Sequence, residues 1–131
     1  MLFAISCSSA AAPTIEPLAP PPIDPRLESL SQGEIELQVG ARSVQDIDPL
    51  ALARRAGTPP TCAEFVFLFS WRTSGSQELA FRGNRQGGQF DIGRGAQSQA
   101  SISGCVLLQA LNDSDRTVEG RLRYIVARPR P

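Results

Sequence analysis

Residues 62–72 read Cys62-Ala63-Glu64-Phe65-Val66-Phe67-Leu68-Phe69-Ser70-Trp71-Arg72, a strongly apolar run within a chain of 131 residues. Four aromatic side chains alternate along it with Val66 and Leu68, so both faces of an extended backbone would be apolar here. Aromatic and β-branched residues favour strands, and a strand that is apolar on both faces is typical of the interior of a sheet. We therefore expect an interior β-strand from Cys62 to Arg72.

Further strand signals follow this run toward the C-terminus. Four glycine-rich or polar segments are typical of turns, namely Ser74-Gly75-Ser76, Gly83-Asn84, Gly87-Gly88 and Asn112-Asp113-Ser114-Asp115. They separate stretches of strand-like composition at residues 78–82, 89–92, 100–111 and 117–127. Upstream, Ile35, Leu37 and Val39 alternate with polar residues, which indicates a half-buried strand. The pattern predicts a mainly β fold, a small antiparallel β-sandwich or open barrel of about six strands.

Two short helices are predicted from the same start signal. Asp24-Pro25 and Asp48-Pro49 each place a capping carboxylate before a proline at the first helical position. Gly33 would end the first helix and Gly57 the second, because glycine readily adopts the conformation that follows a helix C-terminus. The domain is therefore expected to carry one or two short helices besides its strands.

The chain is long enough for one domain and not for two. Residues 8–24 are rich in Pro, Ala and Ser and lack apolar periodicity, so we expect an extended, solvated, polyproline-like tether. A Pro-rich ligand that lies in a partner's groove is the alternative for this segment. Residues 25–131 are expected to form a single β-rich domain.

A short cysteine motif precedes the tether. Ala4-Ile5-Ser6-Cys7 places a small residue before a cysteine, and a Ser/Ala/Pro segment follows. This motif resembles the lipobox of bacterial lipoproteins, in which the cysteine is acylated and becomes the mature N-terminus. The resemblance implies that residues 1–7 are the remnant of an export and lipidation signal, that Cys7 is lipidated, and that the protein is exported and membrane-anchored, at the periplasmic or outer surface. An incidental cysteine in a cytosolic protein is the alternative.

Lipidation of Cys7 would leave Cys62 and Cys105 to pair with each other. That disulfide would close a loop of about 44 residues and stabilise the fold by on the order of 3–4 kcal/mol. The alternative is two buried, reduced thiols, which are common in strands. A zinc site is not expected, because three dispersed cysteines without histidine lack the spacing of zinc ligands.

The composition argues against several kinds of active site. All 13 basic residues are arginine, and the absence of histidine removes Ser-His and Cys-His nucleophile pairs and histidine-ligated metals. Glu64, Glu78 and Asp91 are the candidate carboxylates, but Glu64 lies near a strand start and Asp91 is expected to face water. Gly93-Arg94-Gly95 lacks the following helix that a phosphate-binding loop needs, so we expect a turn. We expect no enzymatic activity, no cofactor and no metal ion.

Charge is balanced overall but not along the chain. Thirteen acidic residues cancel the 13 arginines, which gives no reason to expect nucleic-acid binding. Residues 1–60 carry seven acids and four arginines, whereas residues 61–131 carry six acids and nine arginines. A solvated surface is one interpretation of the basic half, and a docking face is the other, because arginine is enriched at interfaces. The candidate docking residues are Arg82, Arg85, Arg94, Arg121, Arg123 and Arg128, with residues 128–131 expected to form a mobile basic tail.

The function expected from these features is non-catalytic. We expect an accessory or scaffolding subunit of a bacterial envelope membrane complex, with protein partners, a lipid anchor in the membrane and no nucleic-acid partner. The alternative is a free ligand-binding β-module that uses the arginine-bearing strands to bind an anionic glycan or peptide. A subunit would copurify with membrane proteins, whereas a free binder would elute alone.

Overall fold

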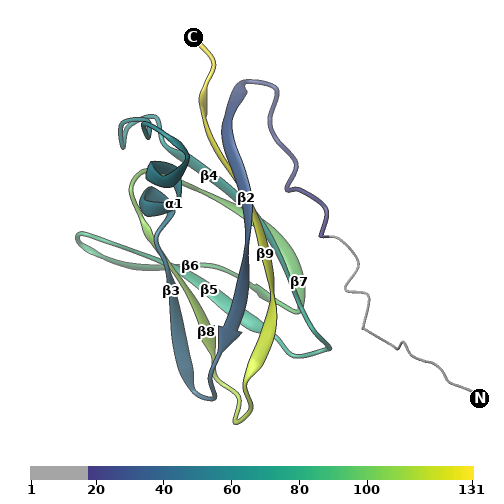
Figure 1. The fold of residues 1–131 in the computed structure, drawn as a ribbon. Helices are drawn as coiled ribbons and strands as arrows, with labels where there is room; N and C mark the ends of the chain where they lie inside the picture. Colours follow the sequence, from purple (N-terminus) through teal and green to yellow (C-terminus); the bar gives the residue numbers. More distant parts are fainter. Residues whose placement is uncertain (1–17) are drawn as a thin grey trace, which may run out of the picture.

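Residues 18–131 are described by a computed structural model, in which they form two packed β-sheets and one short helix (Figure 1). The strands are β2 (Leu27–Val39), β3 (Ser43–Ile47), β4 (Val66–Thr73), β5 (Leu79–Arg85), β6 (Gly88–Gly95), β7 (Gln97–Ser103), β8 (Leu107–Asn112) and β9 (Val118–Pro129). The strand order is β2-β9-β4-β7 in one sheet and β3-β8-β5-β6 in the other. The predicted signal at residues 1–7, with Cys7, and residues 8–17 of the predicted tether lie outside the described residues.

The two sheets arise from one long hairpin that is rolled up. β2 pairs with β9, β3 with β8, β4 with β7 and β5 with β6, so the two arms of the chain pair from the outside inward. The pairs β4–β9 and β5–β8 then close each sheet. This nesting of antiparallel pairs in a double sheet is the jelly-roll arrangement. The predicted antiparallel sandwich is confirmed, with eight strands in the described part of the chain rather than about six.

β4 is an interior strand, as the apolar run predicts. It lies between β9 and β7, and Phe67, Phe69 and Trp71 point into the space between the sheets, where each is fully buried. Phe81 of the opposite sheet packs against Trp71 with ring centroids 4.3 Å apart. The indole Nε1 of Trp71 donates a hydrogen bond of 3.0 Å to the carbonyl oxygen of Gly95, so its one polar atom is satisfied in the core.

The stretch at residues 100–111 was predicted as one strand, and this was wrong. It is divided between β7 in one sheet and β8 in the other. Gly104 separates them with a φ of 88°, a left-handed conformation that glycine adopts without strain, and its N–H donates to the carbonyl oxygen of Phe65. β3 is a further strand that the sequence pattern did not reveal.

The helix predicted between Asp24 and Gly33 is also wrong. Asp24 does accept a hydrogen bond from the N–H of Arg26, as a capping residue would, but the chain then continues as β2. β2 pairs along its whole length with β9, and Gly33 lies opposite Tyr124. A Cβ atom at Gly33 would overlap the Tyr124 ring, so glycine here makes room for an aromatic side chain and does not end a helix.

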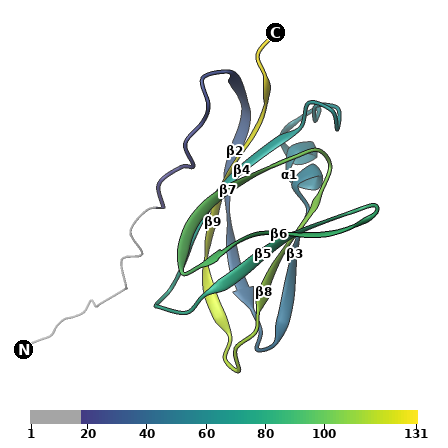
Figure 2. The same cartoon turned by 180° about the vertical axis from the view of Figure 1, so that it is seen from behind.

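The second predicted helix is confirmed as α1 (Pro49–Ala56). The Asp48 carboxylate accepts from the backbone N–H groups of Leu50 and Ala51, and Gly57 ends the helix. Leu52 and Ala53 are buried, which fastens the helix to the core. Figure 2 shows α1 at the same end of the sandwich as the C-terminus and opposite the turn between β8 and β9.

The contact between β9 and the end of β4 predicts one strong substitution effect. A Cβ atom at Gly120 would overlap the carbonyl oxygen of Arg72 and lie 2.9 Å from the Cα of Thr73. Because backbone cannot move aside cheaply, Gly120→Ala is expected to lower the free energy of unfolding by about 2–3 kcal/mol in urea denaturation. Gly40→Ala is the matched control, since its nearest neighbour would be the Ser43 Oγ at 3.5 Å. Equal losses for the two variants would contradict this explanation.

The hydrogen bonds in the turn before β2 lead to a prediction about the pKa of Asp24. Side-chain hydrogen bonds from Arg26, followed by the bond from its backbone N–H, lower the pKa of Asp24 from 3.8 to about 2. A lowered pKa in the folded state means that the interaction is complete above pH 4 and is lost as the pH falls toward 2. The Asp24 carboxyl carbon, followed by NMR, should titrate with a midpoint near 2. Arg26→Ala should raise that midpoint, and an unchanged midpoint would show that Arg26 is not the cause.

Candidate functional site

The Cys62–Cys105 disulfide is confirmed. It joins the turn that precedes β4 to the turn between β7 and β8, and the two Cα atoms are 5.0 Å apart. Cys62 is exposed and Cys105 is half-buried, so the bond lies at the surface of the sandwich rather than among its core side chains. The alternative of two buried, reduced thiols is therefore excluded.

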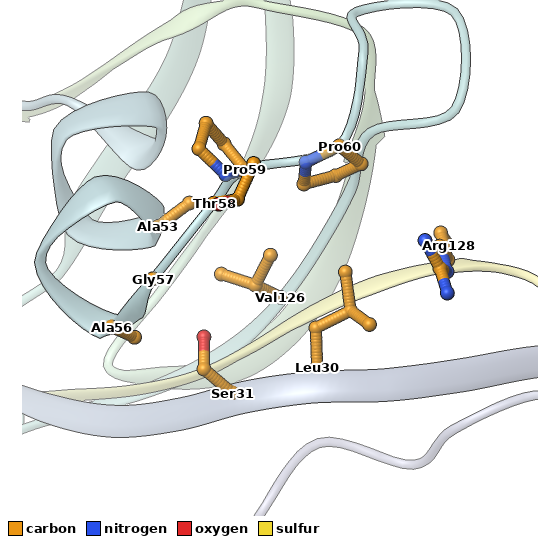
Figure 3. Close-up of a pocket in the computed structure, with 10 residues that line it drawn as sticks. All are labelled: Leu30, Ser31, Ala53, Ala56, Gly57, Thr58, Pro59, Pro60, Val126 and Arg128. Atoms are coloured by element: carbon orange, nitrogen blue, oxygen red, sulfur yellow. The ribbon is translucent and has the colours of Figure 1, made fainter.

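A pocket of about 290 Å³ opens at the helix end of the sandwich (Figure 3). The β-bulge between Ser29 and Ser31 presents Leu30 to it, and 38% of the Leu30 surface remains exposed. The other walls come from α1, the segment after it and β9, through Ala53, Ala56, Gly57, Thr58, Pro59, Pro60, Val126 and Arg128.

The chemistry that this pocket offers is limited. Its walls are mostly small or apolar, and the hydroxyls of Ser31 and Thr58 have no base among the residues that line it. The one charged lining residue, Arg128, donates from Nε to the Glu28 carboxylate at 3.2 Å. The pocket can hold a small apolar group beside a paired guanidinium, and the lining residues supply no nucleophile–base pair.

The six arginines of the predicted docking face do not come together. Arg82, Arg85 and Arg94 belong to the sheet that contains β5 and β6, whereas Arg121, Arg123 and Arg128 belong to β9 in the other sheet. Most of them already have partners, as Arg94 pairs with Glu78 and Asp113, Arg121 with Glu34, and Arg128 with Glu28. Arg82 donates to Gln109, and Arg85 lies over the Phe90 ring. The alternative function, binding of an anionic glycan or peptide, gains no single basic surface from this arrangement.

The candidate carboxylates are likewise separated. Glu64 is exposed and accepts from the Thr61 hydroxyl in the turn before β4, whereas Glu78 pairs with Arg94 at 3.9 Å. Asp91 is exposed on β6, as expected. Gly93-Arg94-Gly95 is neither the expected turn nor a phosphate loop, because it forms the end of β6. Within residues 18–131, no group of three or more metal-ligating side chains comes together.

The most distinctive side-chain arrangement holds the segment before β2 against a sheet. Residues 18–23 run along the outer face of the β2-β9-β4-β7 sheet before the chain turns into β2 (Figure 1). The Ser70 hydroxyl donates to the carbonyl oxygen of Ala19 at 3.0 Å, and the Arg123 guanidinium donates to that of Leu18 at 2.9 Å. The Leu18 side chain is only 4% exposed. We call Leu18, Ala19, Ser70 and Arg123 the N-terminal clamp.

This clamp corrects part of the tether prediction. The described residues of the tether, 18–24, form no helix or strand, and Leu18 and Pro21 are buried rather than solvated. On the outer face of the same sheet, Leu68, Ile125 and Ala127 form a second small apolar cluster, against which Leu27 and Val66 pack. Burying Leu18 favours the bound position of the segment.

The C-terminal segment is also held against the domain, which corrects the prediction that residues 128–131 form a mobile tail. Pro129 belongs to β9, and the backbone N–H of Arg130 donates to the carbonyl oxygen of Arg26 at 2.8 Å. The Arg130 side chain donates to the carbonyl oxygen of Pro25. In the described part of the chain, no helix has the length and apolar character needed to cross a membrane.

Comparison with known proteins identifies no family. No protein-family model and no curated protein matches this chain. Solved structures show distant likenesses. A structure of the disulfide-linked pili of Bacillus endospore appendages is 7% identical, over 77% of this chain and 88% of that one, with a TM-score of 0.49.

Two further structures are similarly distant. The cupin domain of an XRE-family transcriptional regulator from Enterobacter cloacae is 13% identical, over 79% of this chain and 96% of that one, with a TM-score of 0.40. A virus-like particle of the extra small virus of the prawn Macrobrachium rosenbergii is 12% identical, over 95% of both chains, with a TM-score of 0.32. Because all three TM-scores lie below 0.5, none of these likenesses indicates what this chain does.

Sequence reasoning missed the clamp and the pocket. Arg123 was assigned to a docking face, yet it holds the chain's own backbone. Leu18 interrupts the Pro-rich segment, and this large apolar residue was a signal that the segment touches the domain. The sequence did not indicate that Leu30 lines the pocket, because its position depends on the β-bulge in β2.

Removal of the disulfide is expected to cause a measurable loss of stability. The bond spans 43 residues, so Cys62→Ser together with Cys105→Ser should lower the free energy of unfolding by about 4 kcal/mol in the chain-entropy model. Urea denaturation followed by Trp71 fluorescence measures the loss. Cys7→Ser is the control and should leave the midpoint unchanged. A loss below about 1 kcal/mol would show that the unfolded chain gains little freedom when the bond is absent.

Proposed function

We propose that this protein is an exported, non-catalytic accessory or scaffolding subunit of a bacterial envelope complex, tethered through its N-terminus. The observation that carries the proposal is the Cys62–Cys105 disulfide at the surface of the sandwich. Structural disulfides persist in oxidising compartments and are rare in the reducing cytosol of mesophiles. An exposed cysteine such as Cys62 would be open to reduction there, which supports export.

The N-terminal clamp supports the tethered arrangement. Ser70 lies on β4 and Arg123 on β9, the two central strands of their sheet, and both side chains hold backbone carbonyls of the segment that leads to the tether. A force applied through the N-terminus would therefore reach the middle of the sheet directly, before it reaches the edge strand β2. A domain that hangs from a membrane anchor benefits from such an attachment.

Lipidation of Cys7 is the proposed anchor, and its support is the resemblance to the lipobox. One acyl chain binds a membrane reversibly, whereas two or more hold a protein stably. The proposed partners are protein subunits of a membrane-bound complex, with no nucleic acid.

Fractionation of cells that express the protein from its native gene tests this proposal. The wild-type chain should sediment with membranes, Cys7→Ser should become soluble, and Ser9→Ala should behave as wild type. Maleimide should label Cys62 and Cys105 only after reduction. Mild detergent extraction should then release the protein in a larger complex.

Three outcomes would contradict it. Free thiols at Cys62 and Cys105 in intact cells would place the protein in a reducing compartment. Equal membrane recovery of wild type and Cys7→Ser would show that Cys7 does not anchor the protein to the membrane. Elution as a single chain after extraction would favour a free binding module over a subunit.

A further inference from the structure

Four strands lie at the edges of the two sheets, and three of them carry features that discourage pairing. β2 has three glutamates, Glu28, Glu34 and Glu36, and a bulge. β3 is only five residues long and includes Asp46. β6 carries Asp91 and Arg94 and contains three glycines, and its pairing with β5 has a bulge in which Ile92 of β6 is the extra residue. Charges, bulges and short length are the devices by which proteins protect sheet edges from unwanted pairing.

β7 is the edge strand without such protection. Its seven residues, Gln97-Ser98-Gln99-Ala100-Ser101-Ile102-Ser103, include no charge and no proline, and its pairing with β4 shows no bulge. β4 is its one hydrogen-bonded neighbour among the described strands, and no described strand pairs with the backbone groups along the other side of β7. Five of its residues are exposed, and only Ile102 is buried.

The side chains of β7 alternate in a way that suits a second copy of the same strand. Gln97, Gln99, Ser101 and Ser103 share the outer face of the sheet with Ser70, whereas Ala100 and Ile102 point inward with Phe69 and Phe67. An antiparallel pair of β7 strands centred on Ala100 would place Gln99 opposite Ser101 of the other copy, and Gln97 opposite Ser103. Each outward pair joins an amide to a hydroxyl, so donors and acceptors meet and no like charges do.

We infer that β7 is a self-association edge, through which two copies of this chain join about a two-fold axis into one continuous eight-stranded sheet. The absence of charge favours a second copy as the occupant, because the same strand supplies both sides of such a seam and any charge on it would lie close to its own copy. The same pairing through β2 would place its glutamates against glutamates of the second copy. The inference concerns the folded domain alone and does not depend on export or on the tether.

Sedimentation of the purified full chain at rising concentration tests the inference, with Cys7→Ser in every sample to prevent cross-linking. The parent chain should form dimers in the micromolar to millimolar range that is typical of small interfaces. Ser101→Lys adds an exposed charge at the centre of the edge and should abolish the dimer. Val44→Lys adds the same charge to β3, where Val44 is 45% exposed, and should leave the dimer intact.

A charge-swap pair keeps the test independent of folding defects. Ser101→Lys and Ser101→Glu should each be monomeric alone, and their mixture should form a heterodimer, because the two charges lie diagonally across the axis. A parent chain that stays monomeric at about 1 mM would overturn the inference. So would a dimer that survives Ser101→Lys, or one that Val44→Lys alone disrupts, since that dimer would use the other sheet.

Discussion

The row of aromatic side chains along β4 is the constraint on which the sandwich depends. Phe67, Phe69 and Trp71 fill the space between the sheets, and Phe81 and Tyr124 meet them from β5 and β9. Because these rings are large, the two sheets must lie far enough apart to hold them and close enough to exclude water. The small residues follow from this requirement: Gly33 lies beneath Tyr124, and Gly83 lies beneath the ring of Phe90.

The parts of the fold that could be predicted from sequence are those in which a local pattern and the tertiary contacts agree. The apolar run at β4 became the central strand, and Asp48-Pro49 began a helix whose Leu52 enters the core. Asp24-Pro25 is the same local signal with a different result. There the following residues pair with β9 along a full strand, and the capping carboxylate serves a turn instead.

The candidate site likewise contains one feature that the sequence predicted and others that depend on contacts between distant parts of the chain. The disulfide followed from counting cysteines, because few pairings were open to three residues. The N-terminal clamp could not be found in that way, since Arg123 reaches Leu18 across 105 positions and Ser70 reaches Ala19 across 51. The division of the six candidate arginines between two sheets could not be predicted for a related reason, because a count of arginines along the chain does not say which sheet each one occupies.

The nesting of strand pairs has a consequence for how the protein is made. β9 follows every other described strand in the sequence, yet it lies between β2 and β4 in its sheet. A ribosome therefore releases β2 and β4 long before the strand that joins them exists. Half of the sandwich cannot assemble during synthesis, and the contacts that complete it are among the most distant along the chain, which slows folding. The sheet that contains β2 therefore stays incomplete until nearly all of the described chain has been made.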